Sequence, residues 1–263
     1  MEQLLRSILI EPLLQENYAL RLVRALEAFS GLLLENGESV APYTENALAR
    51  FASYPVETQS RIYHGFLKYV SAVLEIVEAG IPLRNTEQSL WCLFKKHGLR
   101  PRHDLFSSID KEDMIEIYLP NQLQWYRSFN YFQYSSYSLG ELICIPWQEL
   151  YAHQDTHMSF FQEITEGIFS NRIQESVFPG LGPSTSKELF SSKQLLASLE
   201  ARILSPVSGI DGRNEAFVVS WKVQLLDSLS INRGPEVEFK GFTSPQLVAN
   251  VLDDGIYETP NAP

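Results

Sequence analysis

The sequence is poor in cysteine, in long apolar runs and in positive charge. Two cysteines among 263 residues, Cys92 and Cys144, are too few for a disulfide framework, so a reducing compartment, the cytoplasm, is expected. No apolar run approaches the roughly 20 residues that cross a bilayer, and acidic Glu2 stands where a secretory signal carries basic residues. The formal net charge of -11 argues against nucleic acid and anionic membranes as partners.

The acidic charge is distributed unevenly along the chain. Residues 1–105 carry nearly equal numbers of acidic and basic residues, and most of the acidic excess lies after them. An acidic surface that keeps the second part in solution is the simplest explanation, because net charge bears on solubility rather than on fold. The apolar spacing also changes, from helical to alternating, after Pro101. Together the charge and the spacing predict a helical domain over 1–105, a mixed domain over 106–232 and a tail over 233–263.

Apolar residues recur at spacings of three and four through the first hundred residues, which is typical of helices with one broad apolar face. Asn36-Gly37 and Gly80 are expected helix stops, and Thr44 and Thr86 are expected N-caps. The predicted helices span residues 2–10, 16–35, 44–53, 56–79 and 86–97.

The apolar faces of these helices allow two interpretations. They either close into a self-contained bundle or also form a surface for homodimerisation or docking. Strict heptads are absent, so a long coiled coil is not expected. In the second interpretation, making the stripe Val70, Val73 and Val77 polar would break the dimer.

After Pro101 the apolar pattern changes to alternation, the period of half-buried strands. Residues 114–119 and 123–129 form one predicted hairpin. Residues 199–203 and 217–225 form a second, in which the alternation lasts for nine residues.

Between the two hairpins the sequence indicates helices and loops. Ser138 and Asp155 are expected to cap two helices. The glycines and prolines of residues 178–186 oppose regular structure and predict a loop. One more strand is expected, from either residues 171–178 or residues 236–242.

One stretch carries a family resemblance. The segments Tyr137–Leu142 (YSLGEL) and Pro146–Asp155 (PWQELYAHQD) are similar to a motif of the PAS family. The order of hairpin, helices and hairpin also resembles a PAS domain, a small antiparallel sheet with helices between its second and third strands. The chain departs from the motif at Cys144, Gln154 and Thr156, where a glycine, a proline and an acid are usual.

The resemblance covers about residues 110–228 and implies a sensor or interaction module. The fold class that follows is α+β, an N-terminal all-α region followed by a PAS-like antiparallel sheet with inserted helices. No kinase, cyclase or DNA-binding motif accompanies it. The resemblance therefore implies a non-catalytic signalling or regulatory protein that binds a small-molecule ligand or a protein partner, with the N-terminal helices as its output or dimer surface.

Aromatic residues are dense between positions 125 and 137, with seven in thirteen positions. They form either sheet core or the wall of a pocket for a flat or apolar ligand. Arg127 is the one basic residue among them, which speaks against stacking on nucleic-acid bases. The residues expected to contact a ligand are Trp125, Tyr126, Phe129, Phe161 and Trp221.

Two further classes of function stay open. A small-molecule enzyme on a cone-shaped α+β fold would use His153, Asp155 or His157 as acid or base. No metal site is predicted there, because Asp155 is expected to begin a helix and the two histidines then need not share a face. His157 is the nearest candidate for the haem ligand of some PAS sensors, and no cofactor is assigned. The second class is a structural adaptor with no occupied pocket.

Overall fold

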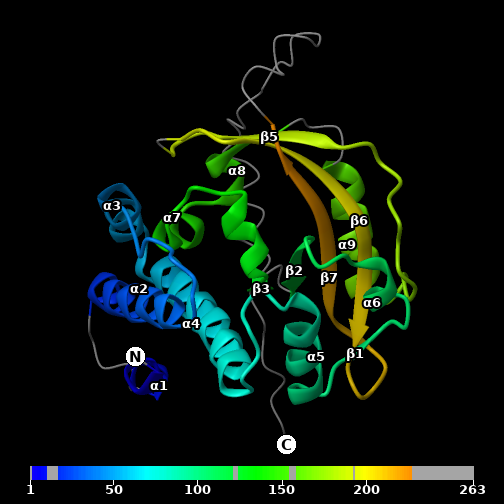
Figure 1. The fold of residues 1–263 in the computed structure, drawn as a ribbon, viewed down its shortest axis with the longest axis horizontal. Coiled ribbons are helices and arrows are strands. Elements are labelled where there is room, and N and C mark those ends of the chain that lie inside the picture. The colour runs from blue at the N-terminus through cyan, green and yellow to red at the C-terminus, as the bar shows by residue number, and fades with distance from the viewer. Residues whose placement is uncertain (1, 11–16, 121–123, 154–157, 192, 227–263) are drawn as a thin grey trace, which may run out of the picture.

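The computed structural model describes residues 2–10, 17–120, 124–153, 158–191 and 193–226 (Figure 1). Helices come first along the chain, and an antiparallel sheet with further helices between its strands follows. The prediction of a fold that mixes helices with an antiparallel sheet is confirmed.

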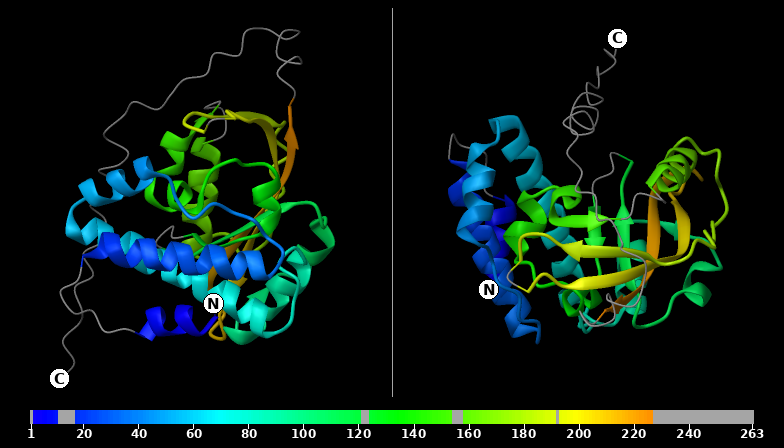
Figure 2. Two further views of the ribbon diagram at one scale, coloured as in Figure 1. Left: turned by 60° about the vertical axis from the view of Figure 1, so that its left-hand side comes forward. Right: turned by 90° about the horizontal axis from the view of Figure 1, so that it is seen from above.

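The first five helices lie together beside the sheet (Figures 1 and 2). They are α1 (Glu2–Ile10), α2 (Tyr18–Glu35), α3 (Glu45–Ser53), α4 (Val56–Glu78) and α5 (Thr86–Lys96). Thr44 caps α3 as predicted, since its hydroxyl accepts from the Ala47 amide. The prediction for α5 was wrong by one residue. The Asn85 side chain accepts from the Gln88 amide, so Asn85 is the cap and Thr86 is the first helical residue.

The strands form one sheet. They are β1 (Arg100–Pro101), β2 (Met114–Tyr118), β3 (Gln124–Arg127), β4 (Tyr151–His153), β5 (Ser184–Glu188), β6 (Leu196–Ser208) and β7 (Asn214–Leu225). Their order is β3-β2-β7-β6-β5-β4, with β1 paired to β6, and every described pair is antiparallel. The two predicted hairpins correspond to β2–β3 and β6–β7. Because β2 pairs with β7, the hairpins lie side by side.

The short helix α6 (Leu105–Ser108) precedes the first hairpin. Four further helices connect the two hairpins: the 3-10 helix η1 (Phe129–Gln133), α7 (Leu139–Cys144), α8 (Trp147–Leu150) and α9 (Met158–Phe169). Ser138 caps α7 as predicted, in a capping box with Glu141. The predicted cap Asp155 lies outside the described residues. The strand predicted to reach Phe129 ends at Arg127, and Phe129 begins η1.

The loop predicted at residues 178–186 is shorter than expected, because β5 begins at Ser184. The glycines and prolines of this segment end at Pro183, and the following STSKE contains no residue that opposes a strand. β5 lies between β6 and β4, and Ser186 and Glu188 are buried although the strand is polar. The prediction was wrong because a polar strand gives no apolar alternation.

Neither segment expected to supply a further strand is described as one. Residues 171–178 contribute an isolated bridge between Val177 and Leu204. Residues 236–242 lie outside the part of the chain that the structure describes. The strand next to β6 is β5, which the sequence pattern did not indicate.

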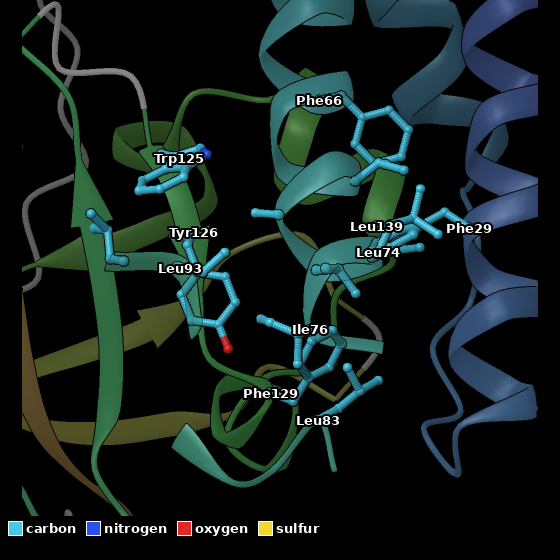
Figure 3. Close-up of a cluster of buried hydrophobic side chains, with 14 of the residues drawn as sticks. Phe29, Phe66, Leu74, Ile76, Leu83, Leu93, Trp125, Tyr126, Phe129 and Leu139 are labelled. Atoms are coloured by element: carbon cyan, nitrogen blue, oxygen red, sulfur yellow. The ribbon is translucent and has the colours of Figure 1, made fainter. Parts of the chain in front are cut away.

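Helices cover both faces of the sheet (Figure 2). On one face, α4 packs against β3 and α5 packs against β1, and one core cluster that includes residues of α2 runs from Leu5 to Val218. Within this cluster, Tyr69 of α4 lies 6.3 Å from Tyr126 of β3, and Phe66 of α4 packs edge-on against Phe29 of α2 (Figure 3). The core therefore continues across residue 105, and the division there stays a prediction as a domain boundary.

On the opposite face, α9 packs against β6 and β7. A second cluster there contains Ile168, Leu204, Phe217 and Val219. The residues from Ala216 to Ser220 are all buried, although the sequence predicted alternation in this strand. The alternation is lost because both faces of β7 are covered.

The helix stripe proposed for a dimer faces the interior of the chain. Val70 and Val73 are fully buried in the first cluster, and Val77 packs against it. This stripe is therefore part of the intrachain core, and a dimer through the N-terminal helices would need other residues.

Candidate functional site

A buried ion pair lies on the sheet face that α9 covers. Glu116 of β2 stands opposite Arg127 of β3 in the register, and the Arg127 Nε donates to Glu116 Oε1 at 2.9 Å. The Arg127 Nη2 lies 2.8 Å from the same oxygen. Both side chains are largely buried. A buried carboxylate is tolerated when a cation and further donors surround it.

Three neutral donors complete the surroundings of Glu116. The Gln124 Nε2 donates to Oε1 at 2.7 Å. The Tyr118 hydroxyl and the Trp221 Nε1 each donate to Oε2 at 3.0 Å. Both carboxylate oxygens are therefore occupied by donors from three strands, and the network fixes the register of β3, β2 and β7.

The Arg127 guanidinium keeps its charge at neutral pH. Burial lowers the pKa of the Arg127 guanidinium and the Glu116 carboxylate raises it, with a net upward shift. The guanidinium also lies over the Tyr131 ring, 4.2 Å from its centroid. Burial raises the pKa of the Tyr118 hydroxyl, which therefore keeps its proton.

Aromatic rings lie next to the ion pair on the same face. Trp221, whose indole contacts Glu116, packs against Phe161 of α9 with 5.3 Å between ring centroids. Tyr118 stacks on Phe217 at 5.2 Å. Tyr118, Phe161 and Trp221 are half-buried, and all three pack against the second cluster. We call Glu116, Tyr118, Arg127, Phe161 and Trp221 the α9-face site.

The structure divides the residues that the sequence predicted for a pocket. Phe161 and Trp221 meet in the α9-face site. Trp125, Tyr126 and Phe129 are buried in the first core cluster, on the side of the N-terminal helices (Figure 3). Trp125 packs edge-on against His97, at 4.8 Å, and Tyr126 lies 6.3 Å from Tyr69. The five residues therefore do not line one pocket, because the sheet separates them.

Glu116, Tyr118 and Arg127 were not predicted from the sequence as site residues. A signal was present, because an acid and an arginine interrupt two short apolar strands. Their pairing depends on the hairpin register, which includes an irregularity between Ile117 and Tyr118. Alternation alone does not give that register.

A second buried carboxylate anchors the connection between η1 and α7. Glu188 of β5 accepts hydrogen bonds from the Ser135 hydroxyl at 3.0 Å and from the Ser136 hydroxyl at 2.6 Å. It also accepts from the Ser191 hydroxyl at 2.5 Å and from the Leu195 amide at 3.1 Å. These bonds hold the connecting segment against β5, so we assign Glu188 a structural role.

The residues of the enzyme interpretation are described in part. The backbone of His153 belongs to β4, and Asp155 and His157 lie outside the described residues. Across the described ranges, no group of three His, Cys, Asp or Glu side chains is placed to hold a metal ion. Cys144 is buried, as expected for a thiol in an apolar context.

None of the helices described by the structure combines the length and apolarity that a membrane span requires. The chain matches no protein-family model and no curated protein. The proposed function therefore depends on the geometry of the α9-face site and on the topology of the sheet.

Proposed function

We propose that this protein is a non-catalytic signalling or regulatory protein that binds a small-molecule ligand through a PAS-like domain, on the face covered by α9. The observation that carries the proposal is the position of three half-buried aromatic side chains, Tyr118, Phe161 and Trp221, next to a buried ion pair. Binding sites for small molecules combine aromatic walls with a few placed polar groups. A flat ligand with one polar edge suits this combination.

The topology supports the PAS-like part of the proposal. A hairpin, β2–β3, is followed by helices α7 to α9 and then by a second hairpin, β6–β7. The first and last strands of this series, β2 and β7, pair in the middle of the sheet. A helix inserted between the hairpins, α9, covers the sheet face on which the aromatic residues lie.

The chemistry of the site favours binding over catalysis. Both oxygens of Glu116 accept hydrogen bonds, so this carboxylate is not poised to take a proton from a substrate. Arg127 stays charged and Tyr118 stays neutral near pH 7, because their pKa values are shifted upward. These groups can orient a ligand through hydrogen bonds without exchanging protons with it.

Native mass spectrometry and an absorption spectrum of the full chain, purified from its own host, test the proposal. We expect a retained small molecule in the wild-type protein. Phe161→Ala should lose it, because the ring that faces Trp221 is removed. Trp91→Ala is the matched control, since Trp91 is a half-exposed ring stacked on Phe106 at the other side of the sheet.

The same experiment has two outcomes that would overturn the proposal. One is a wild-type chain that carries no small molecule, which would favour a protein partner or a structural adaptor. The other is a ligand retained equally by Phe161→Ala and by Trp91→Ala, which would place the ligand elsewhere. Circular dichroism of each variant shows that the fold persists.

A further inference from the structure

Two neighbouring cavities share two cationic residues of the second hairpin. Arg202 of β6 and Lys222 of β7 line both a cavity of about 350 Å³ and one of about 480 Å³. The larger cavity is also lined by Phe178, Leu181 and Ala201. We call it the Arg202 cleft. The cleft combines an apolar wall with two cationic hydrogen-bond donors, Arg202 and Lys222.

Arg202 occupies a special position in the sheet. The register between β6 and β7 shifts between Ala201 and Ile203, so Arg202 is an extra residue with no partner across the pair. Such a bulge turns a side chain away from the regular alternation, and bulges of this kind are common next to binding sites. Here the bulge directs the guanidinium toward two aspartates and the shared wall of the cavities.

A buried aspartate orients the guanidinium. The Arg202 Nε lies 3.3 Å from Asp113 Oδ1, and the Asp113 side chain is 3% exposed. The other Asp113 oxygen accepts from the Ser220 hydroxyl at 2.8 Å, so the carboxylate is fixed. The second partner, Asp110, lies 2.8 Å from Arg202 Nη1 but is 64% exposed. An exposed ion pair contributes little, so a ligand can replace Asp110 at low cost.

Two cations of the Arg202 cleft lie where an anion that displaces the exposed Asp110 would contact them. Arg202 and Lys222 line the cleft with one carboxylate, Glu200, and Asp110 and Asp113 hold Arg202 from the side of the smaller cavity. Lys222 is 57% exposed and lies 4.0 Å from Glu200, so its ammonium group is not held by a close partner there.

We propose that the Arg202 cleft binds a small monocarboxylate that carries an apolar arm. The planar guanidinium matches a carboxylate with two parallel hydrogen bonds, and Lys222 adds a second charge. The apolar arm lies against Phe178, Leu181 and Ala201. A doubly charged phosphate is disfavoured, because Glu200 and Asp110 lie at the same cations.

This site adjoins the α9-face site at Ala201, which pairs with Trp221, but its two cations do not belong to that site. Lys222 follows Trp221 in β7, and neighbouring side chains of a strand point to opposite faces. The inference therefore does not depend on the proposed function, and the two fail in different experiments.

Calorimetric titration of the full chain with octanoate tests the proposal. We expect saturable binding of one octanoate with a Kd below about 1 mM, and at least about tenfold weaker binding of 1-octanol and octyl phosphate. Lys222→Gln should weaken octanoate binding about tenfold through the loss of one cation. Lys68→Gln, an exposed lysine of α4, is the matched control and should bind as the wild type does.

Variants of Arg202 and of the apolar wall complete the test. Arg202→Lys keeps a cation beside buried Asp113, so it preserves the fold while it removes the planar fork, and it should also weaken octanoate binding. Phe178→Ala should weaken octanoate binding more than butyrate binding, because the short acid does not reach the ring. Phe161→Ala should leave octanoate binding unchanged, since that ring belongs to the other site.

Three results would overturn the proposal. The first is the absence of saturable octanoate binding. The second is equal affinity for octanoate and 1-octanol, which would show that the carboxylate is not recognised. The third is octanoate binding that Phe161→Ala abolishes and Lys222→Gln leaves intact, which would place the acid in the α9-face site and support the proposed function instead.

Discussion

Glu116 and Arg127 face each other on neighbouring antiparallel strands, and the Arg127 Nη2 lies 2.8 Å from the Glu116 Oε1. The pair is buried on the sheet face under α9, where the Trp221 indole adds a further hydrogen bond. Removing either partner of such a pair destabilises the fold, because the remaining buried charge has no water to solvate it.

Glu116→Gln should destabilise the fold by about 3 kcal/mol, because it leaves the Arg127 cation buried without its carboxylate. Urea unfolding followed by circular dichroism measures this loss. Glu112→Gln is the matched control, since Glu112 pairs with Lys111 at 3.6 Å on the exposed surface. Its unfolding midpoint should not change measurably.

The double variant Glu116→Leu/Arg127→Leu isolates the coupling between the two residues. It should be less destabilised than the sum of the single leucine variants, because neither charge is then left alone. Simple additivity of the two single effects would show that the buried pair does not act as a unit.

Glu188 makes the stability of the fold depend on pH in the acidic range. Burial raises the pKa of this carboxyl, but hydrogen bonds from Ser136, Ser191 and the Leu195 amide outweigh burial and hold it below the ordinary value of 4.5. The folded state therefore binds this proton less readily than the unfolded chain does. Ionised Glu188 stabilises the fold above about pH 4.5, and this contribution is lost as the pH falls through the lower folded pKa.

The pH dependence of Glu188→Gln checks this sign. At pH 7 the variant should be less stable than the wild type by about 2 kcal/mol, because hydrogen bonds to a charge become bonds to a neutral amide. The difference should shrink as the pH falls below 4.5. Urea unfolding at a series of pH values measures it, and a difference that grows on acidification would contradict the assignment.

Gly140 marks a close approach between α7 and the loop before α3. A Cβ at this position would lie 2.8 Å from the Tyr43 Cβ and 3.1 Å from the Tyr43 Cα. The Gly140 amide also donates to the Pro42 carbonyl at 2.8 Å, so the two segments cannot easily move apart. Gly140→Ala should destabilise the fold by about 1–3 kcal/mol through overpacking.

Thermal unfolding of Gly140→Ala and Gly182→Ala measures the Tm of each variant against that of the wild type. Gly182 is the control, because a Cβ there meets no atom within 4 Å. We expect a lower Tm for the first variant and no loss for the second. Equal Tm values would mean that α7 and the loop containing Tyr43 can move apart to admit the added methyl group at no cost in stability.

Cys144 should be chemically inert in the native protein. Burial raises the pKa of this thiol to about 12, and the thiolate is the reactive form. Iodoacetamide at pH 8 should leave Cys144 unmodified in buffer and alkylate it in urea, as peptide mass spectrometry would show. Rapid alkylation of the native protein would indicate that α7 opens.

Local chemistry allowed part of this fold to be predicted. The helix starts at Thr44 and Ser138 follow from side-chain oxygens that accept from nearby amides. The second hairpin follows from alternation over many residues. Of the candidate ligand contacts, Phe161 and Trp221 lie against each other, and their contact with a ligand stays a prediction. Trp125, Tyr126 and Phe129 were not, because aromatic density does not show which sheet face a side chain occupies.

The sequence by itself determined the helical periodicity of the first hundred residues and the change to strands after them, since both depend on neighbours a few positions apart. Tertiary structure decided that β5 is a strand, that β2 pairs with β7 and that Glu116 meets Arg127 and Trp221. Those contacts join residues as many as 107 positions apart, as Met114 and Trp221 are. They depend on strand register and on the burial of both sheet faces, which arise when the whole chain packs.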